Sequence, residues 1–260
     1  MPSMKDEEGD AMYSQTVASP LRSAFIPSLS QLEKAPAPTL RDLFRGQLSE
    51  SFSPGEAIFW EGDPSSHIFD VVEGVLRVHR ILPDGRRAIM GFLHAGDVLG
   101  VSFQSRYLFT AEAVTDVKVR RFARGRFFSL VNETPALRPQ LFAILCDEMS
   151  AAQDQMLLLG RKNAEERVVS FLLAIHRKSG VGDDIELPMS RLDMADYLGL
   201  TMETVSRTMT SLARRGLIAQ GARHTVSLRR LNALREIAGD DAEAAMELQP
   251  ALPRRAVWPN

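Results

Sequence analysis

A glycine turn between two short helical segments is the feature that most constrains the fold of this chain. Ser190 and Asp193 have the spacing of a capping box, which predicts a short amphipathic helix over residues 191–198. Gly199 suits the end of that helix, and Thr201 can cap the start of the next one. Two helices joined in this way form the supersecondary unit that reads DNA, although many helical corners share the pattern.

The second helix has one apolar face and one polar face. Val205, Met209 and Leu212 recur at helical spacing and predict the buried face. The opposite face carries Glu203, Ser206, Arg207 and Thr210, at positions i, i+3, i+4 and i+7. This exposed face is short, polar and chemically varied, as expected for a surface that contacts bases.

Three residues of this polar face are the expected base-reading set. Arg207 can donate two hydrogen bonds to a guanine, and Glu203 can accept one from the amino group of a cytosine. Ser206 would serve a neighbouring base. A carboxylate near phosphates lowers affinity except at the matching base, so it also rejects wrong sequences. The alternative is that Glu203 only complements the helix dipole and pairs with Arg207 at i+4.

A basic wing follows the second helix. Gly216 can close that helix, and residues 217–220 and 225–228 read as two strands around a turn. Residues 206–235 contain seven arginines and no acidic residue, which the net charge of −2 conceals. The expected contacts to the DNA backbone are Thr201, Thr210, Arg214, Arg215, Arg223 and His224.

The N-terminal half reads differently. Short apolar runs between turn signals over residues 46–135 predict an antiparallel barrel or sandwich. Residues 1–45 and 239–260 lack sustained periodicity and are expected to be flexible, with a short helix near residues 39–48. The remaining segment, residues 161–238, is the expected winged helix-turn-helix domain.

A long helix over residues 136–160 should connect these two domains. Its apolar stripe consists of Leu141, Leu145, Met149, Ala152, Met156 and Leu159. The stripe could pair with a second copy of the chain or pack against its own barrel. Cys146 reads most simply as a small buried residue, and a redox switch is the alternative. Gly160 interrupts the pattern, and Asn163 with Glu166 predicts the next helix start.

Composition narrows the classes of function. The chain is 45% hydrophobic and 25% charged, and it has neither a long apolar run nor a secretory signal, so a cytoplasmic protein is expected. One cysteine excludes an intrachain disulfide and any cluster that needs several thiolates from this chain. The sequence contains no nucleophile elbow, P-loop or dinucleotide-binding glycine motif, so neither an enzyme nor a cofactor is expected.

The order barrel, long helix and winged helix-turn-helix resembles the Crp/Fnr family of bacterial transcription regulators over about residues 45–235. The motifs that carry the resemblance are Pro54-Gly55-Glu56, Gly62-Asp63, Gly96-Asp97-Val98-Leu99-Gly100, Leu159-Gly160-Arg161 and Glu203-Thr204-Val205-Ser206-Arg207. It implies an α+β fold with a cyclic-nucleotide-binding-like jelly roll, a dimerisation helix and a DNA-binding domain. The last motif resembles the Fnr signature, which implies a TTGAT-N4-ATCAA palindrome with Arg207 at its guanine and Glu203 at the paired cytosine.

The sensor end departs from two branches of that family. Val101 stands where the cyclic-AMP branch has a glutamate for the ribose, and Phe109-Thr110 replaces its Arg-Ser pair for the phosphate. Burying a phosphate there without a cation would be costly. Residues 1–140 contain no cysteine, so the iron-sulfur cluster of oxygen-sensing Fnr proteins is excluded.

The resemblance that remains is to the FixK-like subgroup, which "FTAEAV" at residues 109–114 suits. It implies a homodimer without a cofactor that activates genes for life at low oxygen. RNA polymerase would be recruited by barrel loops such as residues 82–87, although that loop also reads as a plain hairpin turn. The alternative function is a sensor of the same fold whose barrel binds haem or another non-nucleotide effector, with His67, His79 and His94 as candidate ligands.

Overall fold

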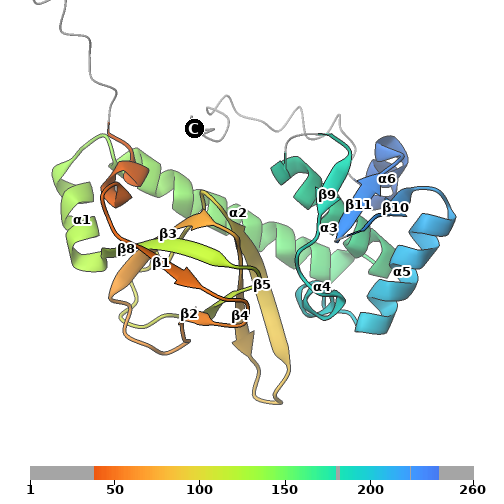
Figure 1. Ribbon diagram of the computed structural model, residues 1–260, viewed down its shortest axis with the longest axis horizontal. Coiled ribbons are helices and arrows are strands. Elements are labelled where there is room, and N and C mark those ends of the chain that lie inside the picture. Colours follow the sequence, from red (N-terminus) through yellow and green to blue (C-terminus); the bar gives the residue numbers. More distant parts are fainter. Residues whose placement is uncertain (1–37, 180–181, 223, 240–260) are drawn as a thin grey trace, which may run out of the picture. The chain divides into compact units, whose positions relative to one another are not determined.

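The computed structural model describes residues 38–179, 182–222 and 224–239 (Figure 1). Its elements follow the expected order of barrel, long helix and DNA-binding domain, and the fold is α+β. The barrel strands are β1 (Ser49–Phe52), β2 (Ala57–Phe59), β3 (His67–Glu73), β4 (Val75–Ile81), β5 (Arg87–His94), β6 (Val98–Leu99), β7 (Thr110–Ala113) and β8 (Val117–Ala123). None of the helices in the described ranges is both long enough and apolar enough to cross a membrane.

Two four-stranded antiparallel sheets form the barrel, in the orders β1-β8-β3-β6 and β2-β7-β4-β5. Alternate residues of the strands point inward, so a two-residue period places Phe69 and Val71 of β3 in the shared core. Phe59 stacks on Tyr107 inside this core. The antiparallel barrel or sandwich predicted from the turn signals is confirmed, in the jelly-roll form that the family resemblance implies.

A 3-10 helix, η2 (Leu40–Phe44), precedes the barrel. Thr39 caps it with a full capping box, and the side chains of Leu40 and Phe44 are buried. The short helix expected near residues 39–48 is therefore present. Because Leu40 and Phe44 are buried, this helix is part of the folded domain. Of the segments expected to be flexible, residues 1–45 and 239–260, the parts at 1–37 and 240–260 lie outside the described residues.

The sequence did not reveal helix α1 (Arg124–Glu133), which directly follows β8. Phe127 and Val131 of α1 are buried in a cluster with Phe44. The expected barrel segment, residues 46–135, thus ends in a helix rather than a strand. Only ten residues long and weakly amphipathic, α1 is stabilised by this tertiary cluster more than by a periodic pattern.

Helix α2 (Arg138–Arg161) is 24 residues long and spans about 36 Å. Gly160 lies inside this helix, so the interruption expected at this glycine is wrong, and the helix ends at Arg161. Leu141 is buried against the barrel side of the chain, with Ile144 and Leu145 partly buried in the same cluster. The first turns of α2 therefore pack on their own barrel.

The DNA-binding domain follows. It consists of α3 (Ala164–Ser179), β9 (Asp184–Glu186), α4 (Arg191–Leu198), α5 (Met202–Arg214), β10 (Ile218–Gln220), β11 (Thr225–Leu228) and α6 (Leu231–Ala238). Its three strands form one antiparallel sheet in the order β10-β11-β9. The core contains Val168 and Leu172 of α3, Leu198 of α4 and Val205 of α5. Neither β9 nor α6 was expected from the sequence.

Local sequence signals set the helix ends in this domain. Asn163 accepts hydrogen bonds from the backbone of Glu165 and Glu166, and the Glu166 carboxylate accepts one from the Asn163 backbone. Ser190 and Asp193 form the expected capping box of α4. Gly199 ends α4 at φ 61°, a left-handed conformation that glycine adopts without a steric penalty.

Candidate nucleic-acid interface

Helix α5 presents the two faces that its sequence predicts. Val205, Met209 and Leu212 are buried, which fixes the rotation of the helix about its own axis. The opposite face exposes Glu203, Ser206, Arg207 and Thr210. The expected base-reading residues therefore share one open surface and can enter a major groove together.

Glu203 and Arg207 already contact each other in the free chain. Arg207 Nη2 lies 2.6 Å from Glu203 Oε1, and their side chains are 78% and 70% exposed. An exposed i,i+4 pair of this kind contributes only about 0.3–0.5 kcal/mol. Both interpretations of Glu203 are thus compatible with this geometry, because so weak a pair can rearrange when bases become available.

The two threonines of the expected backbone-contact set have roles within the protein. The Thr201 hydroxyl caps α5 by accepting a hydrogen bond of 3.1 Å from the Thr204 backbone. The Thr210 hydroxyl donates to the Ser206 carbonyl at 2.9 Å. Each hydroxyl is exposed and keeps further bonding capacity for a phosphate or water.

The four basic residues expected around α5 differ in their surroundings. Arg214 is exposed, whereas Arg215 forms an ion pair with Glu165 of α3, which offsets its charge. His224 is exposed at the wing turn, where its φ of 66° is the left-handed conformation that few residues other than glycine adopt. Arg223 lies outside the described residues.

Arg167 of α3 connects the long helix to the turn of the helix-turn-helix. Its guanidinium donates to the carbonyls of Leu159 and Lys162 at the end of α2, each at 2.9 Å, and to Leu198 at the end of α4, also at 2.9 Å. Cations are favourable at helix C-termini, where carbonyls lack partners. One side chain therefore holds the turn of the helix-turn-helix against the end of α2.

Met202 is an exposed apolar residue on this candidate interface that the sequence did not single out. As the first residue of α5, it is 54% exposed beside Glu203. An apolar side chain in this position suits the methyl group of thymine. The available signal was its place in the first turn of the predicted reading helix.

The nucleotide-pocket positions hold neutral groups. Val101 is buried, the Thr110 hydroxyl accepts a hydrogen bond from the Glu61 backbone, and Phe109 packs on Phe59. These side chains supply no cation to balance a phosphate, which agrees with the departure from the cyclic-AMP branch.

The three barrel histidines have different partners. The His67 ring is hydrogen-bonded to the Ser66 hydroxyl, and His79 Nδ1 lies 3.7 Å from the Glu112 carboxylate. His94 Nδ1 lies 3.1 Å from Lys178 Nζ. Burial is the main cause that lowers the pKa of both His79 and His94, the latter to about 4. The described residues contain no group of three or more His, Cys, Asp or Glu side chains arranged for a metal ion.

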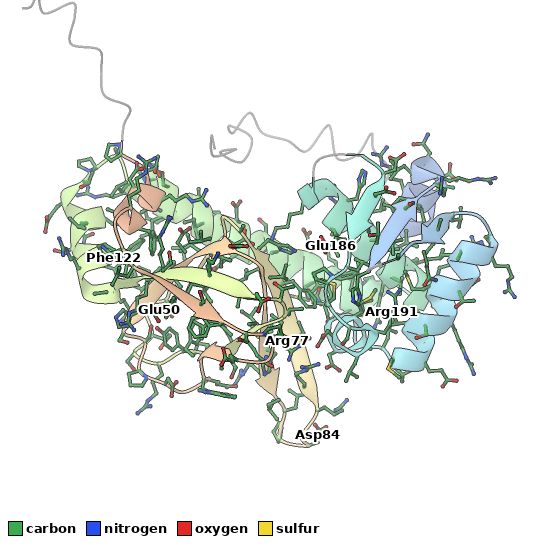
Figure 2. All side chains as sticks on the ribbon, viewed as in Figure 1. Glu50, Arg77, Asp84, Phe122, Glu186 and Arg191 are labelled. Atoms are coloured by element: carbon green, nitrogen blue, oxygen red, sulfur yellow. The ribbon has the colours of Figure 1, made fainter. Side chains whose placement is uncertain are left out.

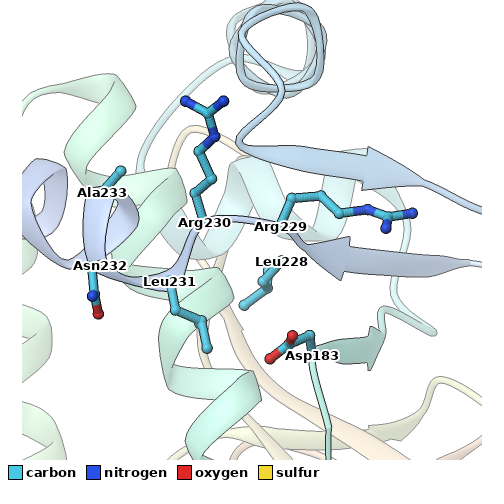
Figure 3. A pocket seen from close by; sticks show the side chains of 7 residues that line it. All are labelled: Asp183, Leu228, Arg229, Arg230, Leu231, Asn232 and Ala233. Atoms are coloured by element: carbon cyan, nitrogen blue, oxygen red, sulfur yellow. The ribbon is translucent and has the colours of Figure 1, made fainter.

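Among the hollows in the surface of the described residues are two pockets. One, with a volume of about 510 Å³, lies between the end of β11 and the start of α6 (Figure 3). Figure 3 shows Arg229 and Arg230 leaving the chain there in different directions, and neither was expected to contact DNA. The other, about 300 Å³ and lined by His67, Tyr107 and Arg121 among others, lies in the barrel.

Comparison with known proteins identifies both domains. Residues 49–134 match the family described as cyclic nucleotide-binding domain, and residues 166–237 match the Crp-like helix-turn-helix domain. The nitrogen fixation regulation protein FixK of Bradyrhizobium diazoefficiens is 46% identical over 172 residues, which are 65% of this chain and 73% of that protein. FixK of Azorhizobium caulinodans is 41% identical over 191 residues, covering 72% of this chain and 77% of the relative.

A solved structure and a further relative give the same result. FixK2 from Bradyrhizobium japonicum aligns with a TM-score of 0.71 and 37% identity over 74% of this chain and 96% of that chain. The transcriptional activator protein FnrL of Cereibacter sphaeroides is 36% identical over 205 residues, 75% of this chain and 82% of the relative. These relatives are regulators rather than enzymes. With its exposed reading helix and its barrel, this chain belongs to the Crp/Fnr family of DNA-binding transcription regulators, and within that family it is FixK-like.

Proposed function

We propose that this protein is a cytoplasmic homodimeric activator that recognises a TTGAT-N4-ATCAA-like palindrome and controls genes for life at low oxygen. The observation that carries the proposal is the exposure of Glu203, Ser206 and Arg207 on one face of α5. The similarity to FixK proteins, named as regulators of nitrogen fixation, supports the physiological part.

Base reading follows from the chemistry of this face. Arg207 donates two parallel hydrogen bonds to the guanine of each half-site, and Glu203 accepts from the cytosine paired with it. Ser206 bonds to a neighbouring base. The backbone contacts come from the wing and the helix ends, with Arg214 and His224 as the described residues most open to phosphates.

Dimerisation uses α2. Phe142, Met149 and Met156 are 67%, 58% and 70% exposed and recur every seven residues, and each is followed three residues later by Leu145, Ala152 or Leu159. This is the spacing of two helices that wrap around each other. Phe142 replaces Leu141 in the stripe expected from the sequence, because Leu141 is buried in its own barrel cluster. A second copy would cover the apolar surface that the chain leaves open.

A titration of DNA binding tests the proposed reading. The protein is bound to TTGAT-N4-ATCAA and to duplexes altered at the G·C pair, over a range of salt concentrations. Arg207→Ala should remove the preference at that pair, worth about 1 to 3 kcal/mol per contact. Arg214→Ala is the matched control: it should weaken all duplexes alike and flatten the salt slope by about one unit. Equal losses on every duplex for both variants would overturn the assignment.

The barrel carries no obligatory effector in this proposal. The neutral Val101, Phe109 and Thr110 support this independence from nucleotides. Dialysed, pigment-free protein should bind its operator at full strength, and a requirement for a small molecule or haem would favour the sensor alternative.

Contact with RNA polymerase is assigned to the hairpin between β4 and β5. Asp84 lies at its tip (Figure 2), where residues 82–86 are exposed. Arg87, at the end of the segment expected to make this contact, instead turns onto α4. The polymerase contact is thus limited to residues 82–86.

Cys146 is a candidate redox site. The structure places it exposed on α2, so the expectation of a buried thiol is wrong for the single chain. In a symmetric dimer two copies of α2 would bring these thiols near each other. Loss of DNA binding on oxidation, abolished in Cys146→Ala, would support the role, and unchanged binding would remove it.

A further inference from the structure

A cluster of charged side chains joins the barrel to the first helix of the DNA-reading unit. Arg77 of β4 and Arg87 of β5 both contact Asp193 of α4, at 3.1 and 2.5 Å. Arg87 also contacts Asp196, one turn further along α4, at 2.9 Å. Figure 2 labels Arg77 on its barrel strand. In this cluster the barrel arginines are more than one hundred positions away in the sequence from the aspartate that they share.

Asp193 has two separate tasks in this cluster. Its Oδ2 atom accepts from the backbone and hydroxyl of Ser190, which closes the capping box of α4. Its Oδ1 atom accepts from both barrel arginines. The side chain is only 5% exposed, so each oxygen has its partners away from water. Buried charges with complete partners of this kind are costly to separate.

The rest of the contact strengthens the same interface. Arg77 also forms a two-point ion pair with Glu112 of β7 inside the barrel, which holds its guanidinium in place. Phe92 of β5 packs against Phe171 and Tyr197 of the DNA-binding domain, with ring centroids 6.2 and 5.7 Å apart. A second ion pair, between Lys178 of α3 and Asp97, measures 2.6 Å.

We propose that Arg77, Arg87, Asp193 and Asp196 are positioning residues that clamp the DNA-reading unit onto the barrel in the orientation that a palindromic operator requires. The inference rests on the proposed function, because only a two-site operator demands a fixed orientation. None of the four residues belongs to the exposed face of α5, so the clamp acts through α4 and leaves Glu203, Ser206 and Arg207 open to DNA.

The physical reason is preorganisation. Between α2 and α3 the chain has only Lys162 and Asn163 outside helices, and rotation there would swing α5. Two reading helices must lie about 34 Å apart to occupy both half-sites. When one half-site is bound, the second binds at an effective concentration that falls as the orientation becomes freer. A clamp built into the fold removes that freedom before DNA arrives.

Binding to two duplexes tests the clamp. Arg87→Gln, Asp196→Asn and the double variant are compared with wild type on the full palindrome and on a duplex with a single half-site. These substitutions leave the Asp193 capping box intact. Arg80→Gln is the matched control, because Arg80 lies on the same hairpin but pairs with Glu61 of the barrel.

Each single variant should bind the palindrome on the order of tenfold more weakly, which corresponds to about 1.4 kcal/mol. Half-site binding and Arg80→Gln should stay within about twofold of wild type, because one reading unit needs no orientation. The double variant should lose no more than the weaker-binding single variant, because both substitutions break the same contact.

Three results would overturn the clamp: unchanged palindrome binding, tighter palindrome binding, or an equal loss on the half-site. An equal loss on the half-site would show that these residues act only in folding. Tighter palindrome binding would show that the contact inhibits DNA binding. A failure of the proposed function gives a different result: wild type itself would bind the palindrome no better than the half-site. The clamp would then be rejected together with the proposed function.

Discussion

Arg207 and Glu203 form a 2.6 Å ion pair on the exposed face of α5, one helical turn apart and directed away from the protein core. The pair stabilises the helix weakly, since water screens both groups. The pair leaves an acid and a guanidinium side by side on the open surface of the helix. Recognition would exchange this contact for contacts to bases.

Glu203→Gln should change the sequence specificity of DNA binding with little effect on the stability of the protein. The free energy of unfolding should change by less than about 0.5 kcal/mol, because the lost pair is exposed. The glutamine amide does not repel phosphates and can donate as well as accept hydrogen bonds. Duplexes altered at the G·C pair should therefore bind more tightly, while affinity for TTGAT-N4-ATCAA changes little. Thermal unfolding and binding across the duplex series measure the two effects. A uniform loss on all duplexes would assign Glu203 to helix stability alone.

Met149→Lys should disrupt dimerisation. Met149 lies in the exposed seven-residue stripe of α2, so two copies of the new charge would face each other in the dimer. We expect the dimer dissociation constant to rise on the order of a hundredfold, about 2.7 kcal/mol, measured by sedimentation equilibrium. Ser150→Lys adds the same charge one residue away from the stripe and is the control. Equal effects of both substitutions would place the interface elsewhere.

His94 should make the protein less stable in acid. Burial, and secondarily Lys178, lowers the pKa of His94 from 6.5 to about 4. Between these two values the unfolded chain binds a proton that the folded chain excludes, so the free energy of unfolding falls as pH falls from 6.5 towards 4. The contribution lost is at most about 3 kcal/mol.

His94→Gln should flatten this part of the stability profile, because glutamine keeps an acceptor for Lys178 but does not titrate. Urea unfolding between pH 4 and pH 7 measures the slope. His67→Gln removes a histidine without changing the Lys178 contact and serves as the control. An identical slope in wild type and His94→Gln would contradict the prediction.

Gly74→Ala should be among the most destabilising substitutions in the barrel. Gly74 connects β3 to β4 at φ +88°, and an added Cβ would lie 2.2 Å from the Asp116 carbonyl oxygen. The clash and the backbone conformation together should cost roughly 3 to 5 kcal/mol. Gly85→Ala has a similar φ of +83° with open space around the new atom, so only about 1 to 2 kcal/mol is expected. Comparable losses in denaturant titrations of the two variants would rule out the steric cause.

The amino-acid sequence alone determined what depends on neighbours along the chain. The capping box at Ser190 and Asp193, the glycine end of α4 and the polar face of α5 are local features, because helix ends and helix faces depend on residues within a few positions. The same holds for the turn signals that predicted an antiparallel barrel or sandwich. The family resemblance rested on these local motifs and is confirmed by the comparisons.

Tertiary structure decided what depends on distant residues. Leu141 and Phe142 are both apolar, and only the packing of η2 and α1 against α2 shows that Leu141 faces the barrel while Phe142 stays exposed. The sequence predicts Asp193 only as part of a helix cap, but its Oδ1 atom also accepts hydrogen bonds from Arg77 and Arg87, more than one hundred residues away. Periodicity fixes which residues share a face of a helix, but it does not identify what lies against that face, because that depends on how separate elements meet in space.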